Sequence, residues 1–166
     1  MRYGGLLFLL TCGGLSLSAF TDAQAQQTAP RKKHPSTRME SISNQKKSLK
    51  ALLEEKQDKR RVLLLYGRDT AQHWLIEQQE ALHQHTDAMT ERDLDVFVLV
   101  ASELQEPDRW YLTHSDFKLV PGDDFQGWLI GKDGGIKHTF TKPVEPNELF
   151  RIIDSMPMRR QEMKKQ

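Results

Sequence analysis

Residues 62–66 read Val62-Leu63-Leu64-Leu65-Tyr66, a continuous apolar run of strand length with charged residues before it. Runs of this kind suit a β-strand that is covered on both faces. A second apolar run, 94–101, follows a segment of helical spacing, 69–88, whose start we expect Asp69 or Thr70 to cap. A strand, a helix and a second strand, with both strands fully apolar, predict a right-handed parallel crossover.

The rest of the domain is predicted as a β-hairpin followed by helices. Residues 125–130 and 136–141 read as strands, and Asp133-Gly134 between them can take the positive φ angles of a tight antiparallel turn. Residues 145–155 carry apolar side chains at helical spacing, and Pro157 suits the first turn of a further short helix. The order β-α-β, loop, β-hairpin and α predicts an α/β, thioredoxin-like fold: a four-stranded mixed sheet flanked by helices.

The first 25 residues read as a cleaved signal peptide. Arg2 supplies a positive n-region, residues 4–20 form a run of apolar and small side chains, and Ala23-Gln24-Ala25 fits a signal-peptidase site. A membrane anchor is one alternative, but the run is short of the roughly 20 strongly apolar residues that span a bilayer. Lipid attachment through Cys12 is another, although Thr11 is bulky for the position before such a cysteine. We expect an exported protein, periplasmic or extracellular, with no integral membrane segment after leader cleavage.

The mature chain divides into a basic arm and an acidic domain. Residues 26–48 are rich in Gln, Lys, Pro, Ser and Thr, and we expect a largely disordered arm. Residues 49–166 form the thioredoxin-like domain with a C-terminal helical tail. It begins with a short amphipathic helix that docks on the domain edge and contains an irregular or weakly helical segment at 106–118.

Charge is distributed unevenly between the arm and the domain. Residues 26–61 hold eleven Lys or Arg and four acids, whereas residues 62–166 hold twelve and eighteen. A basic arm can bind an anionic surface by counterion release, or it can be a solvated tether that keeps the chain soluble. The export signal disfavours nucleic acid as a partner.

The only cysteine of the chain is Cys12, inside the expected leader. A redox thioredoxin carries two cysteines between its first strand and first helix, where the helix N-terminus lowers the thiol pKa. Residues 67–74 of this chain read Gly-Arg-Asp-Thr-Ala-Gln-His-Trp and contain no sulfur. A mature chain without Cys12 is therefore neither a thiol oxidoreductase nor a peroxiredoxin.

Histidines and acids give no metal-site pattern. His83 and His85 are two apart, which points them to different sides of a helix, and His73 is too far from His83 to share an ion. The acids of the predicted turns, Asp123, Asp124 and Asp133, are typical of turn chemistry rather than of a calcium site. We expect no metal and no cofactor.

Two long motifs resemble a known family. They are Gly127-Trp128-Leu129-Ile130-Gly131-Lys132-Asp133-Gly134-Gly135-Ile136-Lys137 and Leu149-Phe150-Arg151-Ile152-Ile153-Asp154-Ser155-Met156-Pro157-Met158-Arg159-Arg160-Gln161-Glu162-Met163. Together with Arg61 and the strand after it, they resemble an uncharacterised thioredoxin-like domain found in small exported bacterial proteins. In animals the domain occurs in sushi-repeat-containing matrix proteins and in coiled-coil domain-containing protein 80. The resemblance covers residues 50–163 and implies a fold and an extracytoplasmic setting, but no catalytic residues.

Two functions of different classes fit these residues. The first is a redox-inactive binding or adaptor protein that holds an envelope or extracellular protein, or an anionic polymer. Its candidate residues for binding a partner or an anion are Arg68, Lys132, Lys137, Arg159 and Arg160. The second is a thiol-independent enzyme or stress-response factor with a site near the N-terminus of the first helix, at Arg68, Asp69 and His73. We assign no catalytic residue.

The C-terminal motif also has a structural interpretation. In it, Met156 and Met163 pack on the sheet, one heptad apart, while the arginines pair with acids of the domain.

Overall fold

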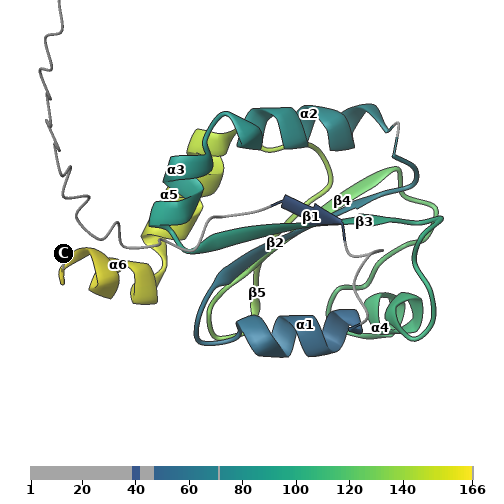
Figure 1. Cartoon of the computed structure of the whole chain (residues 1–166), viewed down its shortest axis with the longest axis horizontal. Coiled ribbons are helices and arrows are strands. Elements are labelled where there is room, and N and C mark those ends of the chain that lie inside the picture. Colours follow the sequence, from purple (N-terminus) through teal and green to yellow (C-terminus); the bar gives the residue numbers. More distant parts are fainter. Residues whose placement is uncertain (1–38, 42–46, 71, 166) are drawn as a thin grey trace, which may run out of the picture. The chain divides into compact units, whose positions relative to one another are not determined.

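The computed structural model describes residues 39–41, 47–70 and 72–165. These residues form a mixed sheet with strand order β1-β3-β2-β4-β5 and with helices on both faces (Figure 1). The strands are β1 (Met39–Ser41), β2 (Arg61–Gly67), β3 (Leu94–Val100), β4 (Phe125–Ile130) and β5 (Ile136–Phe140). The helices are α1 (Leu49–Lys56), α2 (His73–His83), α3 (Thr86–Glu91), α4 (Asp108–His114), α5 (Pro146–Ser155) and α6 (Pro157–Met163).

The four predicted strands are confirmed, and so is the mixed sheet. The central strand β2 pairs in parallel with β3 and antiparallel with β4, so that Leu64 lies opposite both Phe97 and Trp128. Strands β4 and β5 form the predicted antiparallel hairpin.

Strand β1 adds a short parallel edge to β3, with Met39 opposite Val96. It lies in the segment 26–48, which the sequence predicts as a largely disordered arm, and three residues are too few to show a strand period. Residues 26–38 and 42–46 of that segment lie outside the described residues, as does the predicted signal peptide.

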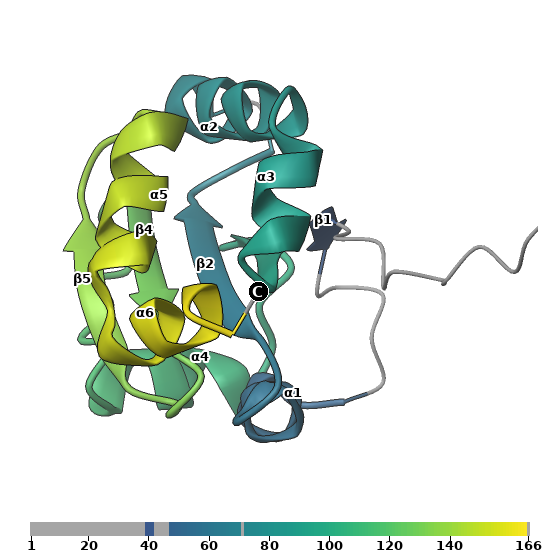
Figure 2. The ribbon, with the colours of Figure 1, turned by 90° about the vertical axis from the view of Figure 1, so that its left-hand side faces the viewer.

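Alternate residues of β2 belong to two cores, which explains its unbroken apolar run. Leu63 and Leu65 pack in the core under α2, α3 and α5, whereas Leu64 and Tyr66 pack in the core over α1 and α4. Figures 1 and 2 show these two groups of helices on opposite faces of the sheet, with α6 beyond one end. Within the described residues, no helix has both the length and the apolar content to cross a membrane.

The predicted helix over 69–88 is divided into α2 and α3. The hydroxyl of Thr86 donates to the carbonyl of His83, and the His85 ring nitrogen lies 2.9 Å from the carbonyl oxygen of Ala81. These side chains satisfy carbonyls at the end of α2, so the chain turns there. The prediction that Asp69 or Thr70 caps the helix is wrong: the N-cap is Gln72, which makes no side-chain capping bond.

Two shorter helices complete the face below the sheet. Helix α1 docks on the domain as predicted, because Leu49 and Leu52 are buried and the Leu49 amide donates to Asp108 at 2.9 Å. The segment predicted as irregular or weakly helical contains a regular helix, α4, whose Leu112 is completely buried.

Candidate functional site

The junction of β2 and α2 corresponds to the position where redox thioredoxins carry their cysteines. Its candidate residues Arg68, Asp69 and His73 are all exposed. Arg68 pairs with Asp124 at 3.2 Å and also donates to the carbonyl of Gly122, and His73 lies 3.8 Å from the Glu77 carboxylate. These contacts make the junction a solvated surface of paired side chains.

The other candidate cations lie at the opposite end of the sheet. Arg68 follows the last residue of β2, whereas Lys132 follows β4, which runs antiparallel to β2. A strand of seven residues is about 20 Å long. The structure therefore brings Lys132, Lys137, Arg159 and Arg160 to one end of the sheet and places Arg68 at the other.

Arg159 is an internal residue, with 1% of its surface exposed. Its guanidinium lies 2.6 Å from the Glu91 carboxylate and 3.2 Å from Asp154, and it donates to the backbone carbonyl of Glu91 at 3.0 Å. Arg159 thus ties α6 to α3 and α5, as in the structural interpretation of the motif. Met156 is buried in the core as that interpretation expects, but Met163 is exposed, because α6 extends beyond the sheet end.

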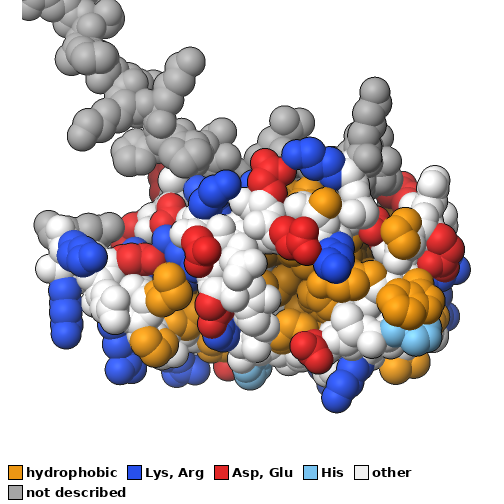
Figure 3. Space-filling view, turned by 90° about the horizontal axis from the view of Figure 1, so that it is seen from below, with side chains coloured by type: hydrophobic (Ala, Val, Ile, Leu, Met, Phe, Trp, Pro, Cys, Tyr) orange, Lys and Arg blue, Asp and Glu red, His pale blue; other side chains and the backbone are white. Residues whose placement is uncertain are grey.

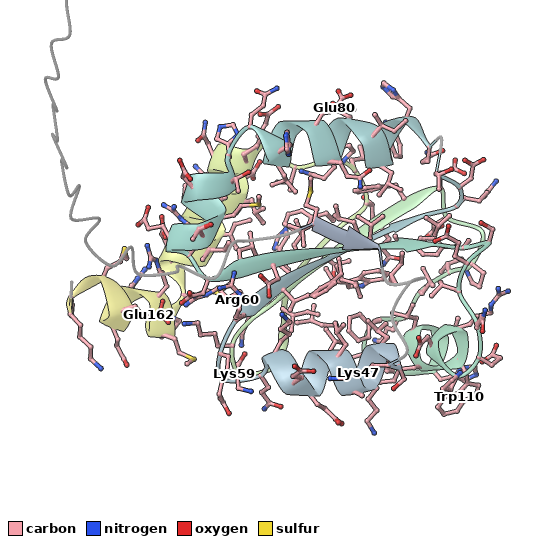
Figure 4. All side chains as sticks on the ribbon, in the orientation of Figure 1. Lys47, Lys59, Arg60, Glu80, Trp110 and Glu162 are labelled. Carbon is pink, nitrogen blue, oxygen red and sulfur yellow. The ribbon has the colours of Figure 1, made fainter. Side chains whose placement is uncertain are left out.

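Glu162 is shared by three cations at this end of the sheet. Its carboxylate lies 3.1 Å from Arg61, 2.8 Å from Lys132 and 3.8 Å from Arg159. Figure 4 labels Glu162 on α6. Because Arg61 starts β2 and Lys132 follows β4, this one carboxylate fastens α6 across two central strands.

A pocket of about 180 Å³ opens beside these ion pairs. Its lining consists of Arg61, Gly131, Lys132, Asp133, Lys137, Met156, Pro157 and Met158. We call these residues the α6 pocket. Arg61 is also 1% exposed, and its Nε has no hydrogen-bond partner within the described part of the chain. The pocket thus combines three cations with the side chains of Met156 and Met158. One of the cations, Arg61, has a donor that makes no hydrogen bond within the described residues.

Lys137 and Asp133 form an ion pair at the pocket's edge. The hydrogen bond from Lys137 is the main reason why the pKa of the Asp133 carboxyl lies below its ordinary value; the amide of Gly135 contributes in the same direction. Gly131 lies beneath this pair: an added Cβ would be 2.6 Å from the Asp133 carboxylate and from the Lys137 chain. A larger residue at this position would require the side chains of Asp133 and Lys137 to shift.

Substitution of Lys137 by alanine is expected to raise the pKa of Asp133 toward its ordinary value. Because the folded-state pKa is lowered, the pair stabilises the fold above the unfolded-state pKa, and this contribution is lost as pH falls through the folded-state pKa. A carboxyl-detected NMR titration measures the change, with Lys142→Ala as the control. An unchanged titration in Lys137→Ala would contradict the assigned cause.

Helix α6, whose start lines the pocket, and the two residues after it carry three further cations. Arg160, Lys164 and Lys165 are exposed and make no ion pair within the described residues. Figure 3 shows Lys and Arg side chains gathered at the end of the molecule where α6 lies. Among the candidate cations of the motif, Arg160 is thus the one open to a ligand, whereas Arg159 is held inside.

Comparison with known proteins places this arrangement in a family. A family model described as a domain of unknown function, DUF4174, matches residues 52–162. The chain belongs to the DUF4174 family. No curated protein matches it.

Solved structures of two other proteins are similar to the DUF4174 domain. The reduced 2-Cys peroxiredoxin of Plasmodium vivax matches with a TM-score of 0.50 and 17% identity, over 66% of this chain and 72% of that one. Thioredoxin peroxidase I of Plasmodium yoelii matches with a TM-score of 0.47 and 15% identity, over 66% and 79% of the two chains. The first of these supports the thioredoxin-like fold of the DUF4174 domain and nothing further.

Sequence reasoning did not find several residues of the α6 end in the DUF4174 domain. Arg61 carries no signal of a buried site because it reads as a charge that flanks a strand. Glu91 and Glu162 reach their arginine partners across 68 and 101 residues. A single sequence holds no signal for contacts of that separation.

Among the described residues, no group of three or more His, Cys, Asp or Glu side chains could hold a metal ion.

Proposed function

We propose that the protein is an exported, redox-inactive, thioredoxin-like binding or adaptor protein whose partner presents anionic groups at the α6 end of the domain. The partner is an envelope or extracellular protein, or an anionic polymer. The observation that carries the proposal is the α6 pocket with its lining cations Arg61, Lys132 and Lys137. The start of α6 lines this pocket, and Arg160 on α6 and Lys164 and Lys165 after it are exposed and make no ion pair among the described residues.

The size of the α6 pocket limits what it takes. Small-molecule sites usually enclose about 300–1,000 Å³, and this pocket encloses about 180 Å³. Its volume suits one carboxylate, sulfate or phosphate group rather than a cofactor. Arginine and lysine recognise such groups by charge-assisted hydrogen bonds.

A bound anion has to share cations that already have internal partners. Lys137 is held by Asp133, and Lys132 by Asp93 and Glu162 at 2.8 Å each. We therefore expect binding of moderate strength in which the outer cations of α6 supply most of the attraction. Long-range attraction of this type falls as salt rises.

The sequence supports redox inactivity and export. Cys12 is the only cysteine, and it lies within the segment that reads as a signal peptide. If that segment is removed, the mature chain holds no thiol for disulfide exchange or peroxide reduction. A periplasmic or extracellular adaptor is consistent with both features.

Binding of the purified full-length protein to heparin, a sulfated polymer, tests the proposal. We expect binding at low salt that weakens as salt rises, and we expect Arg160→Ala to lower the slope of log affinity against log salt by about 1. The matched control is Lys142→Ala, because Lys142 is an exposed cation that follows the far end of β5.

Two results would overturn the assignment to the α6 end. Binding that Arg160→Ala leaves unchanged would assign the polymer to another basic segment, such as residues 26–48. An equal loss of heparin binding in Lys142→Ala would show that positive charge attracts the polymer without a defined site.

A further inference from the structure

A second hollow lies on the face below the sheet, between α1, α4 and the β4–β5 hairpin. It encloses about 200 Å³. Its lining is Lys50, Leu53, Glu54, Gln57, Tyr111, Ser115, Asp116, Phe117, Gly134, Gly135 and Ile136, and we call it the α1–α4 hollow. Figure 3 looks onto this face and shows an apolar depression bordered by charged side chains. It is separate from the α6 pocket, which shares none of these lining residues.

The floor of the α1–α4 hollow is a rigid aromatic stack. Phe117 packs edge-on against Tyr111 at 5.6 Å and against Trp128 at 5.5 Å between ring centroids. The indole of Trp128 donates to the backbone carbonyl of Phe117 at 3.1 Å, which fixes the loop that carries it. Because the floor is tied to the central strand β4, a ligand does not need to order it, and little conformational entropy is lost on binding.

The volume of the hollow suits one side chain. Its 200 Å³ is below the about 300–1,000 Å³ of small-molecule sites. Leu53, Tyr111 and Ile136 are half-buried and leave apolar surface facing the opening. An aromatic or large aliphatic side chain would cover this surface, and burial of such a side chain is the main source of affinity at protein interfaces.

The rim of the hollow carries carboxylates that attract a cation. Asp116 is exposed and makes no ion pair among the described residues, and Glu54 has only a loose contact with Lys50 at 3.9 Å, with both side chains largely exposed. Both carboxylates line the hollow beside Tyr111, whose pKa is raised chiefly by burial and further by the charges of Glu54 and Asp116. A lysine or arginine next to the apolar side chain of the ligand would therefore be attracted by the carboxylates of Asp116 and Glu54 at the rim.

Two further features fit a protein ligand. The hydroxyl of Ser115 is buried at the hollow without a hydrogen-bond partner in the described part of the chain. Trp110 on α4, labelled in Figure 4, is 60% exposed, and its ring stacks on that of His114 with 4.7 Å between the centroids. Exposed tryptophans are over-represented among the residues that dominate protein interfaces.

We propose that the α1–α4 hollow binds an extended segment of a partner protein by one aromatic or large aliphatic side chain with a lysine or arginine next to it. The apolar side chain enters the hollow over Phe117, and the cation pairs with Asp116 and Glu54. This contact uses none of the residues that line the α6 pocket, so the domain can hold two partners or two parts of one partner.

NMR titration of the isotope-labelled full-length protein with capped tetrapeptides tests this site. The probes are Gly-Phe-Lys-Gly, Gly-Phe-Glu-Gly and Gly-Ala-Lys-Gly. We expect the first to give saturable shifts at the amides of Leu53, Ser115 and Ile136 and at the Trp110 indole. Exchange of lysine for glutamate is expected to weaken binding about fivefold, and exchange of phenylalanine for alanine about tenfold or more.

Charge reversal at the rim provides the matched variants. Asp116→Lys is expected to remove the preference for the lysine peptide, whereas Glu80→Lys is not, because Glu80 is an exposed acid on α2 across the sheet (Figure 4). Both positions are exposed, so both variants should fold.

Three results would overturn the proposal: no saturable shift at the hollow, equal affinity for the lysine and glutamate peptides, or an equal effect of the two variants. A fourth contrary result would be shifts at the hollow that depend on protein concentration in the absence of peptide, because these would assign the surface to a second copy of the chain.

Discussion

Replacement of Trp128 by alanine is expected to lower the free energy of unfolding by about 4 kcal/mol. Trp128 is completely buried in the centre of β4, opposite Leu64 of β2, and packs on Phe117. Its removal leaves a large cavity and also leaves the carbonyl of Phe117 without its donor. Urea unfolding followed by circular dichroism measures the loss.

Two further tryptophan variants separate the causes. Trp128→Phe keeps a ring but not the hydrogen bond, and we expect a loss of about 1–2 kcal/mol. Trp110→Ala removes an exposed ring, so it should change stability by less than about 0.5 kcal/mol. A stable Trp128→Ala variant would contradict the described role of this side chain as the support of the hollow.

Replacement of Arg159 by alanine is expected to lower the free energy of unfolding by about 2–3 kcal/mol. The change removes the pairs with Glu91 and Asp154 and the bond to the Glu91 carbonyl. Loss of one partner of a fully buried pair costs about 3–5 kcal/mol. We expect less here because the acids Glu91, Asp154 and Glu162 are 54%, 30% and 26% exposed, so water can solvate them.

Arg160→Ala is the matched control for Arg159→Ala. The two arginines are neighbours on α6, but Arg160 is exposed and unpaired within the described residues. Urea unfolding should show a change below about 0.5 kcal/mol for Arg160→Ala. Heparin binding, compared at equal folded fraction, should be weakened more by Arg160→Ala than by Arg159→Ala. Equal destabilisation by the two variants would contradict the division of the motif into a structural arginine and a binding arginine.

The strands could be predicted from sequence because their apolar patterns are local. The runs at 62–66 and 94–101 indicated strands buried on both faces, and the structure gives β4 the predicted bounds of Phe125–Ile130. The division between α2 and α3 could not be predicted, since it depends on side-chain hydrogen bonds of Thr86 and His85 that compete with the helix. Strand β1 depends on pairing with β3, a tertiary contact with no local pattern.

The residue types of the candidate site could be predicted from sequence, but which of these residues lie together could not. The arginines of the C-terminal motif were identified by their charge, yet only the fold shows that Arg159 faces inward toward Glu91 while Arg160 faces solvent. Arg68 belonged to the same predicted set and lies at the other end of β2. Hydrophobic spacing likewise could not reveal the α1–α4 hollow, because its lining comes from three separate segments of the chain.

The position of a bound anion tests the central claim most directly. We would titrate the labelled full-length protein with a short sulfated oligosaccharide and follow its amide resonances. The proposed function predicts changes at Lys132, Lys137 and the residues of α6, together with a rise in the pKa of Asp133 as the ligand draws Lys137 away. Changes confined to Arg68, Asp69 and His73 would contradict it and would support a thiol-independent site at the start of α2.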